Sequence, residues 1–105
     1  MVFYETSIFT SRILELLSDE SYRELQNALI ANPEAGDLIP GSNGLRKIRW
    51  KGSGRGKRGG LRVIYYLVTK AETFMIYVYP KNDQENLTAD QTRQLRQLVD
   101  EHFKP

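Results

Sequence analysis

The spacing of apolar residues changes along this chain, from a helical period near the N-terminus to strand-like alternation in the middle. Residues 45–50, LRKIRW, alternate, and residues 61–68, LRVIYYLV, form a nearly continuous run of β-branched and aromatic side chains. Residues 73–79 alternate again, and the gap at residues 69–72 is short enough for a hairpin turn. We therefore expect a sheet in which at least the last two strands are antiparallel neighbours.

Helices are expected before and after these strands. Residues 2–5 suit a short strand, and residues 7–17 carry apolar positions typical of a helix buried on one side. Ser18 is expected to cap a second helix that stops at Asn32-Pro33, and Thr88 to cap a final helix over residues 88–103. The expected inward stripes are Tyr22, Leu25, Ala28 and Leu29 in the second helix, and Leu95, Leu98, Val99 and His102 in the final one.

The resulting element order, β-α-α-β-β-β-α, predicts an α+β fold with a small sheet that is antiparallel, or mixed at most. Two N-terminal helices and one C-terminal helix are expected to pack against one face of that sheet. Residues 36–44 contain three glycines and a proline, and are expected to be a turn-rich link. The length of 105 residues suits one domain over residues 1–105.

Composition excludes several classes of chemistry. The chain has no cysteine, which removes disulfides, thiolate catalysis and cysteine-bound zinc. Its single histidine, His102, makes a histidine metal site and ordinary two-histidine nuclease chemistry improbable, so we expect no metal and no cofactor. The N-terminal residues lack a basic region and a long apolar run, and we expect neither a signal peptide nor a membrane span. A cytoplasmic location is the corresponding expectation.

Positive charge is concentrated in residues 46–62. This segment, RKIRWKGSGRGKRGGLR, holds eight of the 15 Lys and Arg residues and none of the 13 Asp and Glu residues. The rest of the chain is therefore acidic overall. A solvated charged loop normally mixes both signs, whereas a segment of one sign indicates a binding surface for a polyanion, most commonly a nucleic acid.

The glycines at positions 54, 56 and 59 formally match the dinucleotide-binding pattern G-x-G-x-x-G. That pattern requires a helix to follow, but residues 61–68 are strand-like, and no P-loop GK[ST] is present. The better interpretation is a basic loop between two strands, whose glycines let the backbone approach a phosphate chain. A long solvated loop without function is the alternative.

Alternation along strands predicts which side chains share a face. Lys47 and Arg49 should lie on the face of Leu45. In the last strand, Tyr77, Tyr79 and Lys81 should lie opposite an apolar trio that packs on the helices, namely Phe74, Ile76 and Val78. One open surface could then gather five residues, namely Lys47, Arg49, Arg62, Tyr79 and Lys81.

Such a surface is suited to cutting RNA through its own 2′-hydroxyl. This reaction needs a base for the hydroxyl, positive charge on the pentavalent phosphate and a proton for the leaving oxygen. Crowded lysines can transfer protons, arginine forks match phosphate oxygens, and an exposed tyrosine can stack on a base. Ordinary strand packing is the alternative role for Tyr77 and Tyr79, and solvation is the alternative for a lone surface lysine.

The combination of GDLIPGSNGLRKIR, GKRGGLRVIYY and YPKN resembles the RelE superfamily of bacterial toxins, and most closely its HigB-type branch. The resemblance spans nearly the whole chain. It implies a toxin of a type II toxin–antitoxin module, an endoribonuclease that enters the ribosomal A site, cleaves mRNA without a metal and so inhibits translation. It also implies a cognate antitoxin, expected to be a small helix-turn-helix protein.

Family roles transfer only to matching residues. The resemblance implies that Lys47 and Arg49 are the paired cations before the loop, that Arg62 stabilises the transition state and that Lys81 is the basic residue after the final strand. Asn82 stands where some members have an arginine, and the chain has no tyrosine after Tyr79. Tyr79 or Lys57 is therefore our candidate for proton transfer. The expected RNA-binding residues are Arg46, Lys51, Arg55, Arg58 and Asn82.

Two other functions remain open at this point. The same scaffold occurs in ParE-type toxins that poison DNA gyrase, although a dense basic strand-loop-strand segment favours RNA. A non-catalytic RNA-binding or ribosome-binding module would carry the same charge without cleavage. A helix-turn-helix DNA reader is disfavoured because the basic residues lie on strands and a loop.

Overall fold

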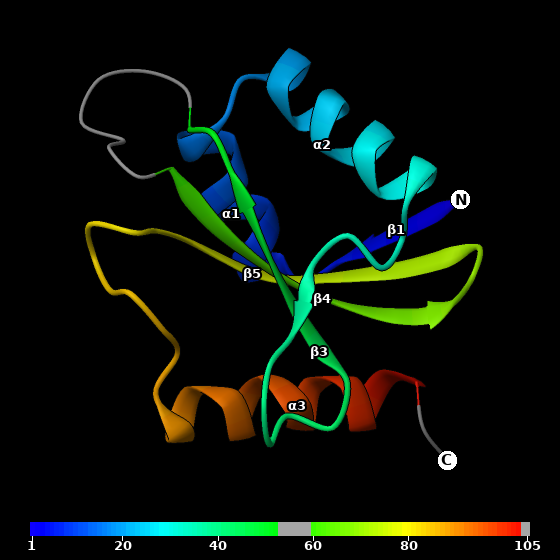
Figure 1. Cartoon of the computed structure of the whole chain (residues 1–105), viewed down its shortest axis with the longest axis vertical. Coiled ribbons are helices and arrows are strands. Elements are labelled where there is room, and N and C mark those ends of the chain that lie inside the picture. Colours follow the sequence, from blue (N-terminus) through cyan, green and yellow to red (C-terminus); the bar gives the residue numbers. More distant parts are fainter. Residues whose placement is uncertain (53–59, 104–105) are drawn as a thin grey trace.

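A twisted sheet forms the centre of the computed structural model, which describes residues 1–52 and 60–103 (Figure 1). Its described elements, in chain order, are β1 (Val2–Glu5), α1 (Ser7–Leu16), α2 (Asp19–Ala31), β2 (Asp37–Leu38), β3 (Leu45–Trp50), β4 (Leu61–Thr69), β5 (Glu72–Pro80) and α3 (Ala89–Phe103). The predicted order is therefore confirmed, and a two-residue strand, β2, is added within the predicted turn-rich link.

The five described strands lie in the order β1-β5-β4-β3-β2. β5 pairs antiparallel with β4, β4 with β3, and β3 with β2, whereas β1 runs parallel to β5. The sheet is thus mixed, and its central strands β4 and β5 form the hairpin that the sequence predicts. This arrangement places the basic strand β3 next to β4, away from the N-terminal strand.

The helices begin where side-chain caps satisfy backbone N–H groups. Ser18 Oγ accepts a hydrogen bond from Ser21 N at 3.1 Å, and Thr88 Oγ1 accepts one from Gln91 N at 3.1 Å, as predicted. Thr6 caps α1 in the same way, through Phe9 N at 3.0 Å.

No helix in the described part of the chain is long and apolar enough to cross a membrane.

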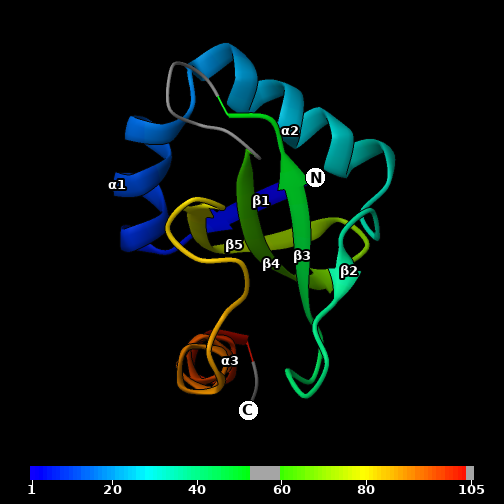
Figure 2. The same cartoon turned by 60° about the vertical axis from the view of Figure 1, so that its left-hand side comes forward.

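The helices lie on opposite faces of the sheet, so the prediction that all pack on one face is wrong (Figure 2). α1 and α2 contribute Phe9, Ile13, Leu25 and Leu29 to a core on one side, where they meet Val63 and other strand residues. α3 contributes Leu95 and Val99 to a second cluster on the other side. In α2 and α3 the predicted stripe residues are buried or half-buried, except for His102, which is exposed and packs edge-to-face with Phe74.

A shift of register in the β4–β5 ladder explains which β5 residues face α3. Tyr65 pairs with Met75 but Ile64 pairs with Tyr77, so Ile76 is an extra residue in β5. Alternation is interrupted there. Phe74 and Ile76 therefore pack in the cluster with Tyr79, and only Val78 lies on the α1–α2 side. The predicted apolar trio Phe74, Ile76 and Val78 is thus split between the two faces.

Candidate functional site

Three functional candidates lie in one row across neighbouring strands. Arg49 of β3 is directly opposite Arg62 of β4, and Arg62 is directly opposite Tyr79 of β5. Side chains at directly paired positions share a face and have Cβ atoms about 5 Å apart. Lys47 lies two residues before Arg49 and therefore on the same face. The register thus brings together residues that are 30 positions apart in the chain.

Burial divides this row. The Arg49 side chain is exposed and Lys47 is half-buried, whereas Arg62 is 4% exposed and Tyr79 is fully buried. The prediction of one open surface is therefore wrong for Arg62 and Tyr79, and so is the prediction of an exposed tyrosine. Tyr79 belongs to the same packed cluster as Leu95 and Val99 of α3. The row passes from solvent at β3 into the protein at β5.

The Tyr79 hydroxyl is buried and has no hydrogen-bond partner among the described residues. Burial raises the pKa of this phenol above its ordinary value of 10.0, an effect that the neighbouring positive charge of Arg62 partly opposes. The hydroxyl therefore stays protonated at neutral pH. A buried hydroxyl without a partner costs stability, which makes it a candidate for a role beyond folding.

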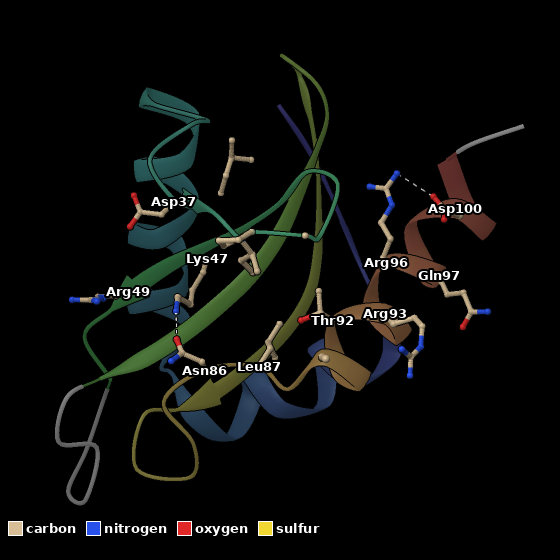
Figure 3. Close-up of a pocket in the computed structure, with 15 residues that line it drawn as sticks. Asp37, Lys47, Arg49, Asn86, Leu87, Thr92, Arg93, Arg96, Gln97 and Asp100 are labelled. Carbon is tan, nitrogen blue, oxygen red and sulfur yellow. Dashed lines mark hydrogen bonds and ion pairs between the residues drawn. The ribbon is translucent and has the colours of Figure 1, made fainter.

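A groove of about 860 Å³ opens beside this row, between the β2–β3 region and α3 (Figure 3). Lys47 and Arg49 lie along it, Leu38 and Ile39 form part of one wall, and Arg93 of α3 lies on the opposite wall. The groove therefore combines cations with apolar surface. Both kinds of contact suit a nucleotide chain, whose phosphates bind cations and whose bases pack on apolar or aromatic groups.

Arg46 lies on the other face of β3 and has structural contacts. Its Nη1 donates to the carbonyl oxygen of Gly36 at 2.8 Å and is 3.3 Å from that of Glu34. The hydroxyl of Tyr65 accepts from Gly36 N at 2.8 Å and donates to the carbonyl of Pro33 at 2.8 Å. Arg46 therefore helps to fix the α2–β2 link, and the structure does not bring it to the groove with Lys47.

The remaining predicted residues lie near the ends of the strands. Lys81 follows β5, where its backbone N–H donates to the carbonyl of Gly60 at 3.0 Å, and its Nζ is 3.8 Å from a carboxylate oxygen of Glu85. Asn82 and Lys51 are exposed. Three predicted residues lie outside the described part of the chain, namely Arg55, Lys57 and Arg58.

The sequence did not indicate two further residues of the groove. Arg96 of α3 donates from Nη1 to the carbonyl of Asn43 at 2.6 Å and pairs with Asp100 at 3.1 Å, so it ties α3 to the turn before β3. Its guanidinium also lies 5.3 Å from the centre of the Tyr66 ring. Asn86, in the β5–α3 loop, accepts a hydrogen bond from Lys47 Nζ at 2.8 Å. The spacing of apolar residues in the sequence gives no information on these two contacts, which join residues 39 and 53 positions apart.

The side chains that could bind a metal ion do not cluster in the described part of the chain. Within residues 1–52 and 60–103, no group of three or more His, Asp or Glu side chains is placed to hold a metal ion.

The fold and the site define a small α+β protein with a mixed sheet, in which the row of Arg49, Arg62 and Tyr79 leads from an open groove into the protein. The family model described as the RelE toxin of the RelE/RelB toxin–antitoxin system matches residues 17–104. The chain therefore belongs to the RelE toxin family. It is a toxin of a toxin–antitoxin system, with an antitoxin as its implied partner, and this family consists in general of ribonucleases.

Proposed function

We propose that this protein belongs to the HigB-type branch and is a ribosome-dependent endoribonuclease of a type II module. As one toxin domain over residues 1–105, it would enter the ribosomal A site in the cytoplasm and cleave mRNA by attack of the 2′-hydroxyl. The observation that carries this proposal is the row of Arg49, Arg62 and Tyr79 across three paired strands. A gyrase poison has no need for such a row beside a cationic groove.

The exposed end of the row is suited to holding the substrate. Lys47 and Arg49 line the groove and can bind the phosphates on either side of the cleaved bond. The exposed Lys81, Lys51 and Asn82 extend this polar surface at the ends of β5 and β3. Positioning of this kind lowers the barrier because the 2′-hydroxyl must lie in line with the leaving oxygen.

The buried end of the row is suited to stabilising the transition state. Arg62 is nine-tenths or more buried, so its positive charge acts with little screening by water. Arg62 is not among the residues that line the groove, so its guanidinium can carry the extra negative charge of the pentavalent phosphate once the bound substrate reaches past Arg49. In the reaction, the 2′-oxygen forms a bond to phosphorus and gives its proton to a base (water or Lys57), while the bond from phosphorus to the 5′-oxygen breaks and that oxygen takes up a proton from an acid.

Tyr79 is our candidate for supplying that last proton, and because its side chain is fully buried, this role requires the bound substrate to displace the groups that cover the hydroxyl. Its hydroxyl is directly opposite Arg62 in the ladder, has no partner among the described residues and is kept protonated by the raised pKa. Lys57, the other candidate for proton transfer, lies outside the described residues. The partner of the toxin in this proposal is a small helix-turn-helix antitoxin.

Induced expression in bacteria tests the proposal. Wild-type protein should arrest growth and leave mRNA ends that are in phase with codons, whereas the Lys47→Ala/Arg49→Ala double variant should do neither. The control is Lys70→Ala, an exposed cation in the β4–β5 turn, which should arrest growth like the wild type. Growth arrest with an SOS response and intact mRNA would refute the proposal in favour of gyrase poisoning. Salt-sensitive RNA binding without cleavage would refute the enzymatic part.

A further inference from the structure

One hydrogen bond joins the cationic strand to the loop that leads into α3. Lys47 Nζ donates to Asn86 Oδ1 at 2.8 Å, and both side chains line the groove (Figure 3). Lys47 is half-buried, and a lysine head group normally samples several rotamers because its stem has four rotatable carbons. An ammonium group has three N–H donors. A bond to Asn86 therefore orients the head group and still leaves donors for phosphate oxygens.

The loop that carries Asn86 is itself held by the N-terminal cap of α3. Gln84 Nε2 donates to the backbone carbonyl of Asn86 at 2.8 Å and to Gln91 Oε1 at 2.8 Å. The same Gln91 oxygen accepts from Thr88 N at 3.0 Å, while Gln91 N donates to Thr88 Oγ1 at 3.1 Å. This pair is a reciprocal capping arrangement of the kind that fixes helix starts. A continuous set of hydrogen bonds thus runs from the first turn of α3 to Lys47.

We propose that Asn86 is a positioning residue that holds the Lys47 ammonium group at the groove, with Gln84 and Gln91 fixing the loop that presents it. The inference deepens the proposed function, because it assigns the β5–α3 loop to the orientation of a substrate-binding cation. Asn86 acts through Lys47 and needs no contact with the substrate. Its loss should leave substrate binding largely intact and lower the rate of the chemical step, since a misplaced charge is felt most in the transition state.

Side-chain NMR tests the positioning itself without reference to any activity. The order parameter of the Lys47 Cε–Nζ group should be higher in the wild type than that of Lys70, which is exposed in the β4–β5 turn. In Asn86→Ala it should fall to the Lys70 value, and in Gln84→Ala it should fall part of the way. The control is Asn27→Ala, the same substitution at an exposed site on α2, which should change nothing. A Lys47 order parameter that is equal in the wild type and Asn86→Ala would overturn the inference.

A double-mutant cycle tests the consequence for catalysis. Single-turnover cleavage is measured with protein in excess over ribosome-bound mRNA. Asn86→Ala should lower the cleavage rate about tenfold, which is the effect of one hydrogen bond to a charged group. The protein concentration that gives half of the maximal rate should change little. In the Lys47→Ala background the same change should lower the rate less than twofold, because the group that it positions is gone. Equal effects in both backgrounds would overturn the inference. A wild type that cuts no mRNA would instead refute the proposed function, and the NMR result would still decide the positioning.

Discussion

The two faces of the sheet are built for different tasks. On the α1–α2 face, fully buried Phe9, Leu25 and Leu29 pack in one cluster with Val63 and Tyr65. On the α3 face, a single helix covers the β4–β5 side of the sheet and leaves an open groove at β3. The first face closes a core, and the second keeps charged side chains within reach of a ligand.

Strand β3 shows the difference within a few residues. Arg46 points to the α1–α2 side and binds backbone carbonyls, whereas Arg49 points to the α3 side and is exposed at the groove. The same residue type therefore has a structural task on one face and a candidate functional task on the other. Charge density alone does not separate the two, but strand alternation does.

The largest expected effect is on stability, from truncation on the α1–α2 face. Leu25→Ala removes a fully buried side chain of α2 and should lower the free energy of unfolding by about 3 kcal/mol through lost burial and a residual cavity. Its match is Leu14→Ala on α1, where the side chain is 69% exposed and the change should stay within about 0.5 kcal/mol. Urea unfolding measures both. Equal losses would show that this face is not the closed core described above.

The next effect is on cleavage, from the buried cation of the other face. Arg62→Lys keeps the charge but loses the planar fork that matches phosphate oxygens, and should slow mRNA cleavage about 100-fold. The matched control is Arg23→Lys, an exposed arginine on α2, which should cleave at the wild-type rate. Thermal unfolding of both variants reports their folding. A cleavage rate near that of the wild type in folded Arg62→Lys would remove Arg62 from the transition state.

Arg46→Ala should affect stability rather than cleavage. The substitution removes the bond to the Gly36 carbonyl at 2.8 Å and should lower the free energy of unfolding by about 1–2 kcal/mol, because the α2–β2 link loses its anchor. Denaturant titration gives the value. If stability were unchanged and RNA binding fell instead, Arg46 would belong with the groove, as the sequence alone predicted.

Tyr79→Phe should separate stability from activity. Replacing a buried hydroxyl that has no partner among the described residues should raise the free energy of unfolding by about 1 kcal/mol. If the hydroxyl donates the proton to the leaving oxygen, the same variant should cleave at least tenfold more slowly. Unfolding and single-turnover cleavage are measured on the same preparation. A more stable variant with full activity would assign Tyr79 to packing alone.

The smallest effect is the dependence of stability on alkaline pH. Burial raises the pKa of Tyr79 in the folded protein, so above pH 10 the unfolded chain releases a proton that the folded protein retains. Stability is therefore fully present below pH 10 and falls as the pH rises toward the folded pKa. Tyr79→Phe should therefore lose less stability than the wild type between pH 9 and pH 11. Parallel curves would show that Tyr79 ionises as it does in the unfolded chain.

The sequence predicted those features of the fold that depend on local signals. Ser18 and Thr88 cap helices because a hydroxyl followed by a periodic apolar stripe is a local pattern. The β4–β5 hairpin follows from alternation and a short turn. Strand β2 was missed because its two residues, Asp37 and Leu38, form a strand only through pairing with β3.

The features that depend on long-range packing were not predictable. Ile76 is an extra residue in β5 and reverses the alternation of side chains along that strand. A reader of the sequence who assumes unbroken alternation places Phe74, Ile76 and Val78 on one face, and therefore places all the helices on that face. The burial of Arg62 and Tyr79 depends on tertiary packing, which brings Tyr79 into one cluster with Leu95 and Val99 of α3. Asn86 could not be recognised because its contact with Lys47 spans 39 residues and involves a loop. Strand alternation correctly placed Lys47 and Arg49 on one face of β3, but it did not predict the burial of Arg62 and Tyr79.

Cleavage of ribosome-bound mRNA by the purified Arg49→Ala and Arg46→Ala proteins tests whether the α3 face of β3 serves catalysis and the α1–α2 face serves folding. The two residues occupy opposite faces of this one strand. Primer extension measures the cut product, normalised to folded protein. Arg49→Ala should cleave about 100-fold more slowly than the wild type, since a charged contact that positions the substrate in line is lost, and Arg46→Ala should stay within about threefold. Equal losses in the two variants, or full activity in Arg49→Ala, would contradict this prediction.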